Sequence, residues 1–213
     1  EILRCLVGSE MCIRDRYTYY MRCKAEVSSP IVMQMSDTLF LMAEEKGDQR
    51  MQAVALCNKL DYFYYKNDQP DSISHYVEIV KDFARKTNQP KYYYFVWSKR
   101  LIYYYIKQYQ YNIALYEANK MMKEAEQEKY MDGIANAYNV LSSIYQLKRL
   151  FNLAINNKKK EIEITLQYNL NKFNLSIYYS GLTNLYCELG EADNALENLN
   201  KSASCLYSST QEY

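Results

Sequence analysis

The side chains best suited to chemistry in this sequence are one histidine and six cysteines. His75 has Glu78 three residues later, and a His/Glu pair at this spacing can contribute to a metal site. One such pair on one helix is weak support, so we expect no metal and no cofactor. The cysteines form no C-x-x-C motif and suit small buried positions on helices. This many unpaired thiols favours the cytoplasm, although a periplasmic sensor domain remains open.

No motif in the sequence indicates catalysis. There is no glycine-rich phosphate loop and no G-x-S-x-G motif. A Ser-His or Cys-His site would have to be built around His75, which nothing else supports, so we expect a protein that is not an enzyme. The densest basic run, Asn156 to Lys160, would wrap around a helix, and we interpret it as a solvated face.

Composition narrows the possible partners. The chain has 213 residues, 49% of them hydrophobic, with a net charge of +1. Such a charge gives no strong attraction to nucleic acid or to an anionic membrane. No apolar run reaches the roughly 18 residues of a spanning helix. Five glycines and three prolines indicate an ordered, mainly helical chain.

The elements that would position these side chains follow a fixed period. A tyrosine recurs at intervals of 41, 40 and 41 residues, a leucine stands four residues before each tyrosine, and a small or aliphatic residue stands nine after it. The tyrosines are Tyr64, Tyr105, Tyr145 and Tyr186; the leucines are Leu60, Leu101, Leu141 and Leu182; the third set is Ile73, Ala114, Ala154 and Ala195. A period of this length is typical of stacked helical repeats.

A second register predicts where every other helix begins. Seven residues after each tyrosine stands an Asp or Asn, whose short side chain can cap the free N–H groups of a first helical turn. These predicted N-caps are Asp71, Asn112, Asn152 and Asp193.

The period predicts five antiparallel helix pairs, in units of about 17–46, 47–90, 91–131, 132–171 and 172–207. The predicted helices are 17–27, 31–46, 48–66, 72–87, 91–108, 113–129, 132–148, 153–168, 172–189 and 194–207. Residues 1–16 fall outside the pattern, and their string LVGSEMCIRDR resembles the translated read-through of a sequencing-library adapter. We expect them to be an artefact, and 17–213 to be a repeat domain truncated at both ends.

The aromatic–Leu–Tyr–Ala register resembles that of tetratricopeptide (TPR) repeats. The fourth unit carries Tyr138, Leu141, Tyr145 and Ala154, and the fifth carries Tyr179, Leu182, Tyr186 and Ala195, with Gly190 in the turn. The second and third units keep the Leu and Tyr but have Cys57 and Ser98 at the aromatic position. The sequence departs from the family in its longer period, in Asp61 and Ile102 at a small-residue position, and in lacking the closing proline. The resemblance covers residues 17–207 and implies an all-α, right-handed solenoid.

The resemblance also implies a candidate binding groove, because fixed positions of the first helix in each TPR unit line the concave surface. The residues at those positions are Asn58, Lys59, Tyr62, Tyr65, Lys66, Lys99, Arg100, Tyr103, Lys107, Asn136, Asn139, Ser143, Gln146, Asn184 and Glu188. Cations, amides and tyrosines suit a protein or an extended peptide with acidic groups.

Two functions remain open at this stage. The first is a non-catalytic binding scaffold, which by its resemblance would be the sensory segment of a bacterial signalling or transcription regulator. The second is a self-associating scaffold or free-standing adaptor, with a homodimer formed through an apolar patch. A peptide-sensing quorum-type regulator without its DNA-binding domain is a further alternative. A ligand groove requires Tyr62, Tyr65 and Tyr103 to be accessible.

Overall fold

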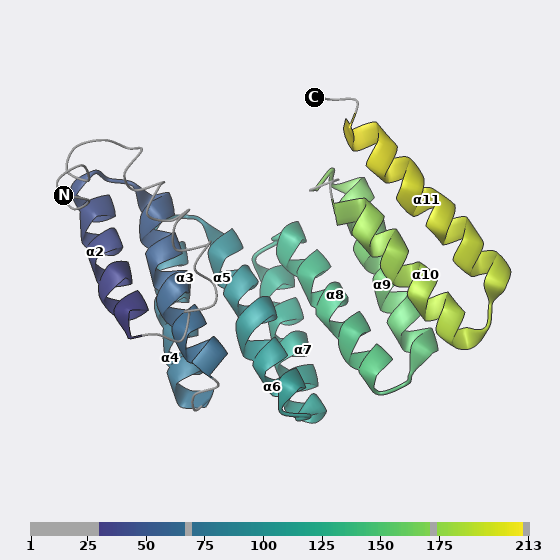
Figure 1. Cartoon of the computed structure of the whole chain (residues 1–213), viewed down its shortest axis with the longest axis horizontal. Helices are drawn as coiled ribbons and strands as arrows, with labels where there is room; N and C mark the ends of the chain where they lie inside the picture. Colours follow the sequence, from purple (N-terminus) through teal and green to yellow (C-terminus); the bar gives the residue numbers. More distant parts are fainter. Residues whose placement is uncertain (1–29, 67–69, 171–173, 211–213) are drawn as a thin grey trace. The chain divides into compact units, whose positions relative to one another are not determined.

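The computed structural model describes residues 30–66, 70–170 and 174–210, with side chains described as far as Leu206, and these residues are almost entirely helical (Figure 1). The chain is therefore all-α within this range, as the sequence predicted. The first predicted helix, 17–27, and the suspected artefact at 1–16 lie outside the described residues. No helix in the described ranges is both long and apolar enough to cross a bilayer.

The described residues fall into two compact units, divided between Tyr104 and Tyr105. The first unit contains α2 (Ile31–Glu45), α3 (Gln49–Lys66), α4 (Pro70–Lys86), α5 (Pro90–Val96), the π-helical segment η2 (Trp97–Ile102) and the start of α6 (Tyr103–Lys107). The second contains the end of α6, α7 (Tyr111–Gln127), α8 (Met131–Leu147), α9 (Phe151–Gln167), α10 (Leu175–Leu189) and α11 (Ala192–Thr210). Within each unit, each long helix packs on the helix that follows it in the sequence.

The periodic apolar residues form the core. All four leucines are buried, from Leu60 at 0% exposed to Leu101 at 6%, and so is the small or aliphatic set that follows each tyrosine. Of the four tyrosines, Tyr64 and Tyr186 are buried, whereas Tyr105 and Tyr145 are half-buried. Small residues on the second helix allow close packing against the first, which explains why alanine recurs at this position.

The turns between helices repeat as regularly as the core. Helices α6, α8 and α10 are each followed by a residue with positive φ, namely Tyr109, Arg149 and Gly190. In each of these turns the backbone carbonyl of the periodic tyrosine accepts a hydrogen bond of 2.9 Å from the backbone N–H five residues later. Gln110, for example, donates to Tyr105 in this way. This backbone bond closes the helix end and sets the direction of the following helix.

The four predicted N-caps are wrong in their role. The helices α4, α7, α9 and α11 begin one residue before Asp71, Asn112, Asn152 and Asp193, so each of these residues is the second residue of its helix. The flanking residues Gln110 and Leu150 make no side-chain cap bond. Before α7 and α9, the left-handed residues Tyr109 and Arg149 place Gln110 and Leu150 at the N-cap positions, one residue earlier than each Asn would need. Asp71 and Asp193 still favour the first turn through the helix dipole.

The remaining boundaries agree with the prediction to within three residues, except that the helix expected at 91–108 is interrupted. Its centre, Trp97–Ile102, is π-helical, a conformation that occurs mostly as short insertions and often near functional sites. Its first residue, Trp97, is buried, as is Tyr94 just before it, and Tyr93 lies 5.0 Å from Trp97 between ring centroids. The interruption therefore lies at a buried aromatic cluster of the first unit, formed by Tyr93, Tyr94 and Trp97.

Candidate protein-interaction surfaces

The first unit contains eight of the predicted groove residues, and the structure separates them into buried and accessible groups. Asn58 and Tyr62 are buried, at 6% and 8% exposed, so they belong to the helix packing. Tyr65 is 49% exposed, Lys66 is exposed, and Tyr103 is half-buried. Of the three tyrosines that a ligand groove requires, Tyr62 is therefore not accessible, because its ring packs against Phe63 at 5.1 Å.

Arg100 connects η2 to α3. Its Nη2 donates to Asp61 Oδ2 at 3.1 Å, and its Nε donates to the other oxygen of the same carboxylate. Its guanidinium carbon lies 5.2 Å from the Tyr64 ring centroid, 5.8 Å from that of Tyr65 and 5.4 Å from that of Phe95. Burial alone would lower the pKa of Arg100, but the hydrogen bond and charge of Asp61 together raise it above its ordinary value. A two-point ion pair under aromatic rings holds this cation in place.

The other cations of this face also lie against tyrosines. Lys66 Nζ is 5.4 Å from the Tyr62 ring centroid, and Lys99 Nζ is 5.4 Å from that of Tyr103. The remaining groove lysine, Lys59, instead forms an ion pair with Asp37 of α2. We call the residues Tyr65, Lys66, Lys99, Arg100 and Tyr103 the aromatic–basic face. It combines positive charge with rigid aromatic area, which are the properties of many protein-binding surfaces.

In the second unit, some predicted groove residues are exposed and others form hydrogen bonds within the unit. Lys107, Gln146, Asn184 and Glu188 are exposed, and Asn136 is half-buried. Asn139 is half-buried and donates from Nδ2 to Glu161 Oε1 at 2.7 Å, while Ser143 donates to the Asn139 carbonyl at 3.1 Å. Asn139 and Ser143 thus take part in bonds within the unit.

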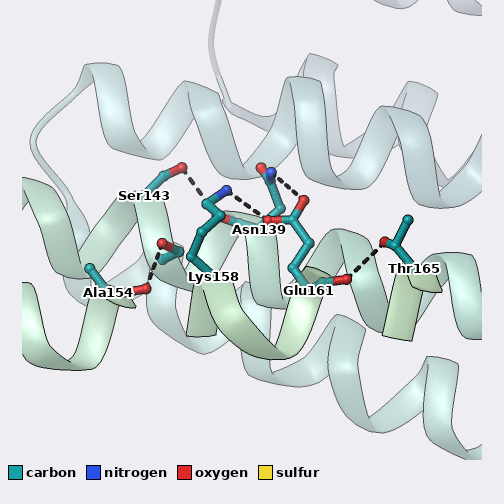
Figure 2. A network of polar contacts seen from close by, with 7 residues as sticks. Asn139, Ser143, Ala154, Lys158, Glu161 and Thr165 are labelled. Carbon is teal, nitrogen blue, oxygen red and sulfur yellow. Dashed lines mark hydrogen bonds and ion pairs between the residues drawn. The ribbon is translucent and has the colours of Figure 1, made fainter. Parts of the chain in front are cut away.

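Figure 2 shows the network to which Asn139 belongs. Glu161 is 1% exposed and accepts from Lys158 Nζ at 2.7 Å as well as from Asn139. The lysine side chain passes 3.5 Å from the position that a Cβ on Gly181 would occupy, and its Nζ lies 5.6 Å from the Tyr178 ring centroid. A buried ion pair thus joins α8, α9 and α10.

This network raises the pKa of the Tyr178 phenol to about 12. Burial contributes most, because it disfavours the phenolate, and the negative charge of Glu161 acts in the same direction. Folding therefore keeps the Tyr178 phenol neutral at pH values near 10 to 12, where a free tyrosine would ionise.

Sequence reasoning missed this pair, although the repeat contains a signal for it. With the 40- and 41-residue intervals, the positions of Lys158 and Glu161 correspond to Val77 and Val80 in α4, and to Ala118 and Met121 in α7. All four counterparts are apolar and buried. Aligning the units would have shown that two charges occupy core positions in α9.

The interpretation of the basic run as a solvated face is wrong for Lys158, which is 9% exposed. The two following lysines are exposed, but their amines also lie over tyrosines: Lys159 Nζ is 5.6 Å from the Tyr186 ring centroid and Lys160 Nζ is 5.3 Å from that of Tyr138. The run therefore contacts the helices on both sides of α9.

The remaining chemical candidates are scattered. His75 is exposed and lies 5.5 Å from Tyr76 between ring centroids, and Glu78 is exposed as well. No group of three or more His, Cys, Asp or Glu in the described ranges could hold a metal ion. Cys187 is exposed, contrary to the expectation of buried cysteines, whereas Cys57 and Cys205 are half-buried. Burial, followed by the charge of Asp61, raises the pKa of Cys57 to about 12.

Comparison with known proteins supports the fold and leaves the family open. No model of a known protein family matches the chain, and no curated protein matches it. Among solved structures, the chain is similar to one described as BtubC (BKLC) from P. vanneervenii, with a TM-score of 0.56 and 11% sequence identity. The match covers 94% of this chain and 89% of that one. At this identity the likeness concerns the fold alone, so the class defined is an all-α, repeat-like helical protein.

Proposed function

We propose that this chain is a non-catalytic scaffold of TPR-like helix pairs, arranged as a right-handed solenoid, that binds an acidic segment of a partner protein. The observation that carries the proposal is the aromatic–basic face, where Tyr65 is half exposed beside Lys66, and Lys99 lies against Tyr103. An acidic extended peptide would pair with the lysines and lay its backbone against the tyrosine rings.

The ion pair between Arg100 and Asp61 has a positioning role in this proposal. Because its positive charge is already matched by Asp61, Arg100 adds little net attraction for an acidic ligand. Its bonds instead hold α3 and η2 together, so that the lysines and tyrosines of the two helices keep a fixed spacing. A preorganised surface loses less conformational entropy on binding.

The resemblance to TPR arrays further favours the sensory or interaction segment of a bacterial signalling or transcription regulator. This part of the proposal rests on the Leu–Tyr–Ala register.

The test is binding of a fluorescein-labelled decapeptide of Glu, Ser and Gly to the full chain, followed by anisotropy. A Lys66→Glu/Lys99→Glu variant should weaken binding at least about tenfold, because attraction becomes repulsion at two positions. The matched control is Lys120→Glu/Lys123→Glu, which makes the same charge change at exposed positions of α7. Equal weakening by both variants would show only general charge attraction, and binding unchanged in the first variant would refute the site.

A further inference from the structure

A pocket of about 220 Å³ lies between α9, α10 and α11 of the second unit. Tyr179, Leu182 and Tyr186 line it from α10 and follow one another at steps of three and four residues, so they share one face of that helix. Leu182 and Tyr186 are buried, and so is Ile162, which lines the pocket from α9. The inner part of the pocket is therefore apolar and aromatic, and the core packing of α9 and α10 holds it in place.

The outer part of this pocket is charged. Lys201 of α11 donates to Glu197 on the preceding turn of the same helix, and the two side chains form an ion pair. Lys159 of α9 lies with its Nζ 5.6 Å from the Tyr186 ring centroid, and it forms no ion pair with any residue that the structure describes. The hydrogen bond and charge of Lys201 lower the pKa of Glu197, and the charge of Lys159 acts in the same direction. Two cations thus accompany one ionised carboxylate, which leaves one positive charge in excess.

The preceding repeat shows that helix packing does not require these charges. The two tyrosines, the leucine and the α11 lysine of the pocket have identical counterparts one repeat earlier, namely Tyr138, Tyr145, Leu141 and Lys160. By contrast, Asn119 stands at the position of Lys159, and Asn156 stands at that of Glu197. The aromatic frame is therefore shared between the repeats, whereas the second cation and the carboxylate are particular to this pocket.

We propose that this pocket binds a small carboxylic acid with an aromatic or branched aliphatic body. The carboxylate pairs with Lys159, and the body lies against the Tyr186 ring and Leu182. One negative charge matches the excess charge of the pocket, whereas a doubly charged phosphate would be repelled more strongly by Glu197.

The volume of the pocket limits the size of this ligand. Sites for drug-sized ligands measure about 300–1,000 Å³, so a pocket of about 220 Å³ suits a smaller molecule. Such a ligand, with about ten non-hydrogen atoms, should bind with a dissociation constant of about 0.1 to 10 mM. The pocket shares no residue with the aromatic–basic face, so this proposal does not depend on the function of that face.

Fluorine NMR of para-fluorophenylacetate titrated with the full chain tests the proposal. The signal should broaden and shift with a dissociation constant in this range. The neutral para-fluorophenylacetamide has the same ring without the charge, so it should bind at least about threefold more weakly.

Two lysine variants locate the site. Lys159→Met should weaken binding of the acid at least about threefold, because it removes the cation that pairs with the carboxylate. The matched control is Lys160→Met, which removes the same charge from the next residue; Lys160 is also exposed but lies over Tyr138 and does not line the pocket. This control should bind the acid as the wild type does.

Four results would overturn the proposal. They are no binding of the acid at the upper end of the concentration range, equal binding of acid and amide, wild-type affinity in Lys159→Met, and equal weakening by both lysine variants. If Lys159→Met loses the helical circular dichroism of the wild type, the comparison of acid and amide on the wild type decides. A peptide that ends in para-fluorophenylalanine and binds more tightly than the free acid would overturn the assignment to a small molecule.

Discussion

The buried pair of Lys158 and Glu161 allows a prediction that isolates one interaction. The two side chains are 11% and 1% exposed, and their charged atoms are 2.7 Å apart. Three variants are needed, namely Lys158→Met, Glu161→Met and the double replacement. Methionine is chosen because it stands at the position of Glu161 in α7, where Met121 is fully buried.

The expected magnitudes follow from burial. Lys158→Met leaves a carboxylate that is almost inaccessible to water without its counter-charge, which should destabilise the chain by about 3–5 kcal/mol. Glu161→Met should cost about 2–4 kcal/mol, because the long lysine side chain can reach toward solvent. The double variant replaces both charges by apolar groups and loses chiefly the bond from Asn139, so it should lie within about 1–2 kcal/mol of the wild type.

The assay is equilibrium unfolding in urea at neutral pH, followed by circular dichroism. The free energies of unfolding are comparable only if the slope against urea is the same in all four proteins. The predicted coupling energy is at least about 3 kcal/mol, well above the roughly 0.5 kcal/mol expected of independent sites. If the double variant were as unstable as the sum of the two single ones, the pair would not be acting as a unit and the reasoning would be refuted.

Three further predictions follow from backbone, thiol and pH chemistry. Gly190 has a φ of 77°, which disfavours any residue with a Cβ, so Gly190→Ala should lower stability by about 1 kcal/mol. Gly181 lies within α10, and a Cβ there would meet the Lys158 side chain only at 3.5 Å, so Gly181→Ala should not lower stability. Thermal melting of both variants distinguishes the two cases. Cys187 is exposed while the pKa of Cys57 is raised to about 12, so iodoacetamide followed by peptide mass mapping should find Cys187 alkylated before Cys57. Equal rates at the two thiols would contradict the raised pKa of Cys57. The pKa of Tyr178 is raised from its ordinary 10.0 to about 12, so folding favours the neutral phenol and stability should fall as the pH rises from about 10 toward 12. Tyr178→Phe should reduce that fall. If the dependence of the melting temperature on pH were the same in this variant, the phenol would not be involved.

The candidate site was predictable only in part. The fixed period identified the helices that carry Lys66, Lys99 and Tyr103, because their spacing follows from the repeat. The burial of Tyr62 and the ion pair between Arg100 and Asp61 were not predictable in this way. The burial of Tyr62 depends on its packing with Val32 and Met33 of α2, and the ion pair depends on the approach of η2 to α3; the spacing of residues within one helix specifies neither.

What the sequence determined by itself is the helical content, most helix boundaries and the core positions. These follow from local periodicity, since apolar residues at helical spacing must be buried together wherever the helices pack. Only the tertiary structure decided which polar side chains form bonds inside the fold and which remain on the surface. The sequence pattern predicts a ligand group at Asn139 and a surface charge at Lys158, yet both side chains bond to Glu161 inside the second unit. A charged side chain can be buried only where partners from other helices neutralise it, and those partners come together only when the chain is folded.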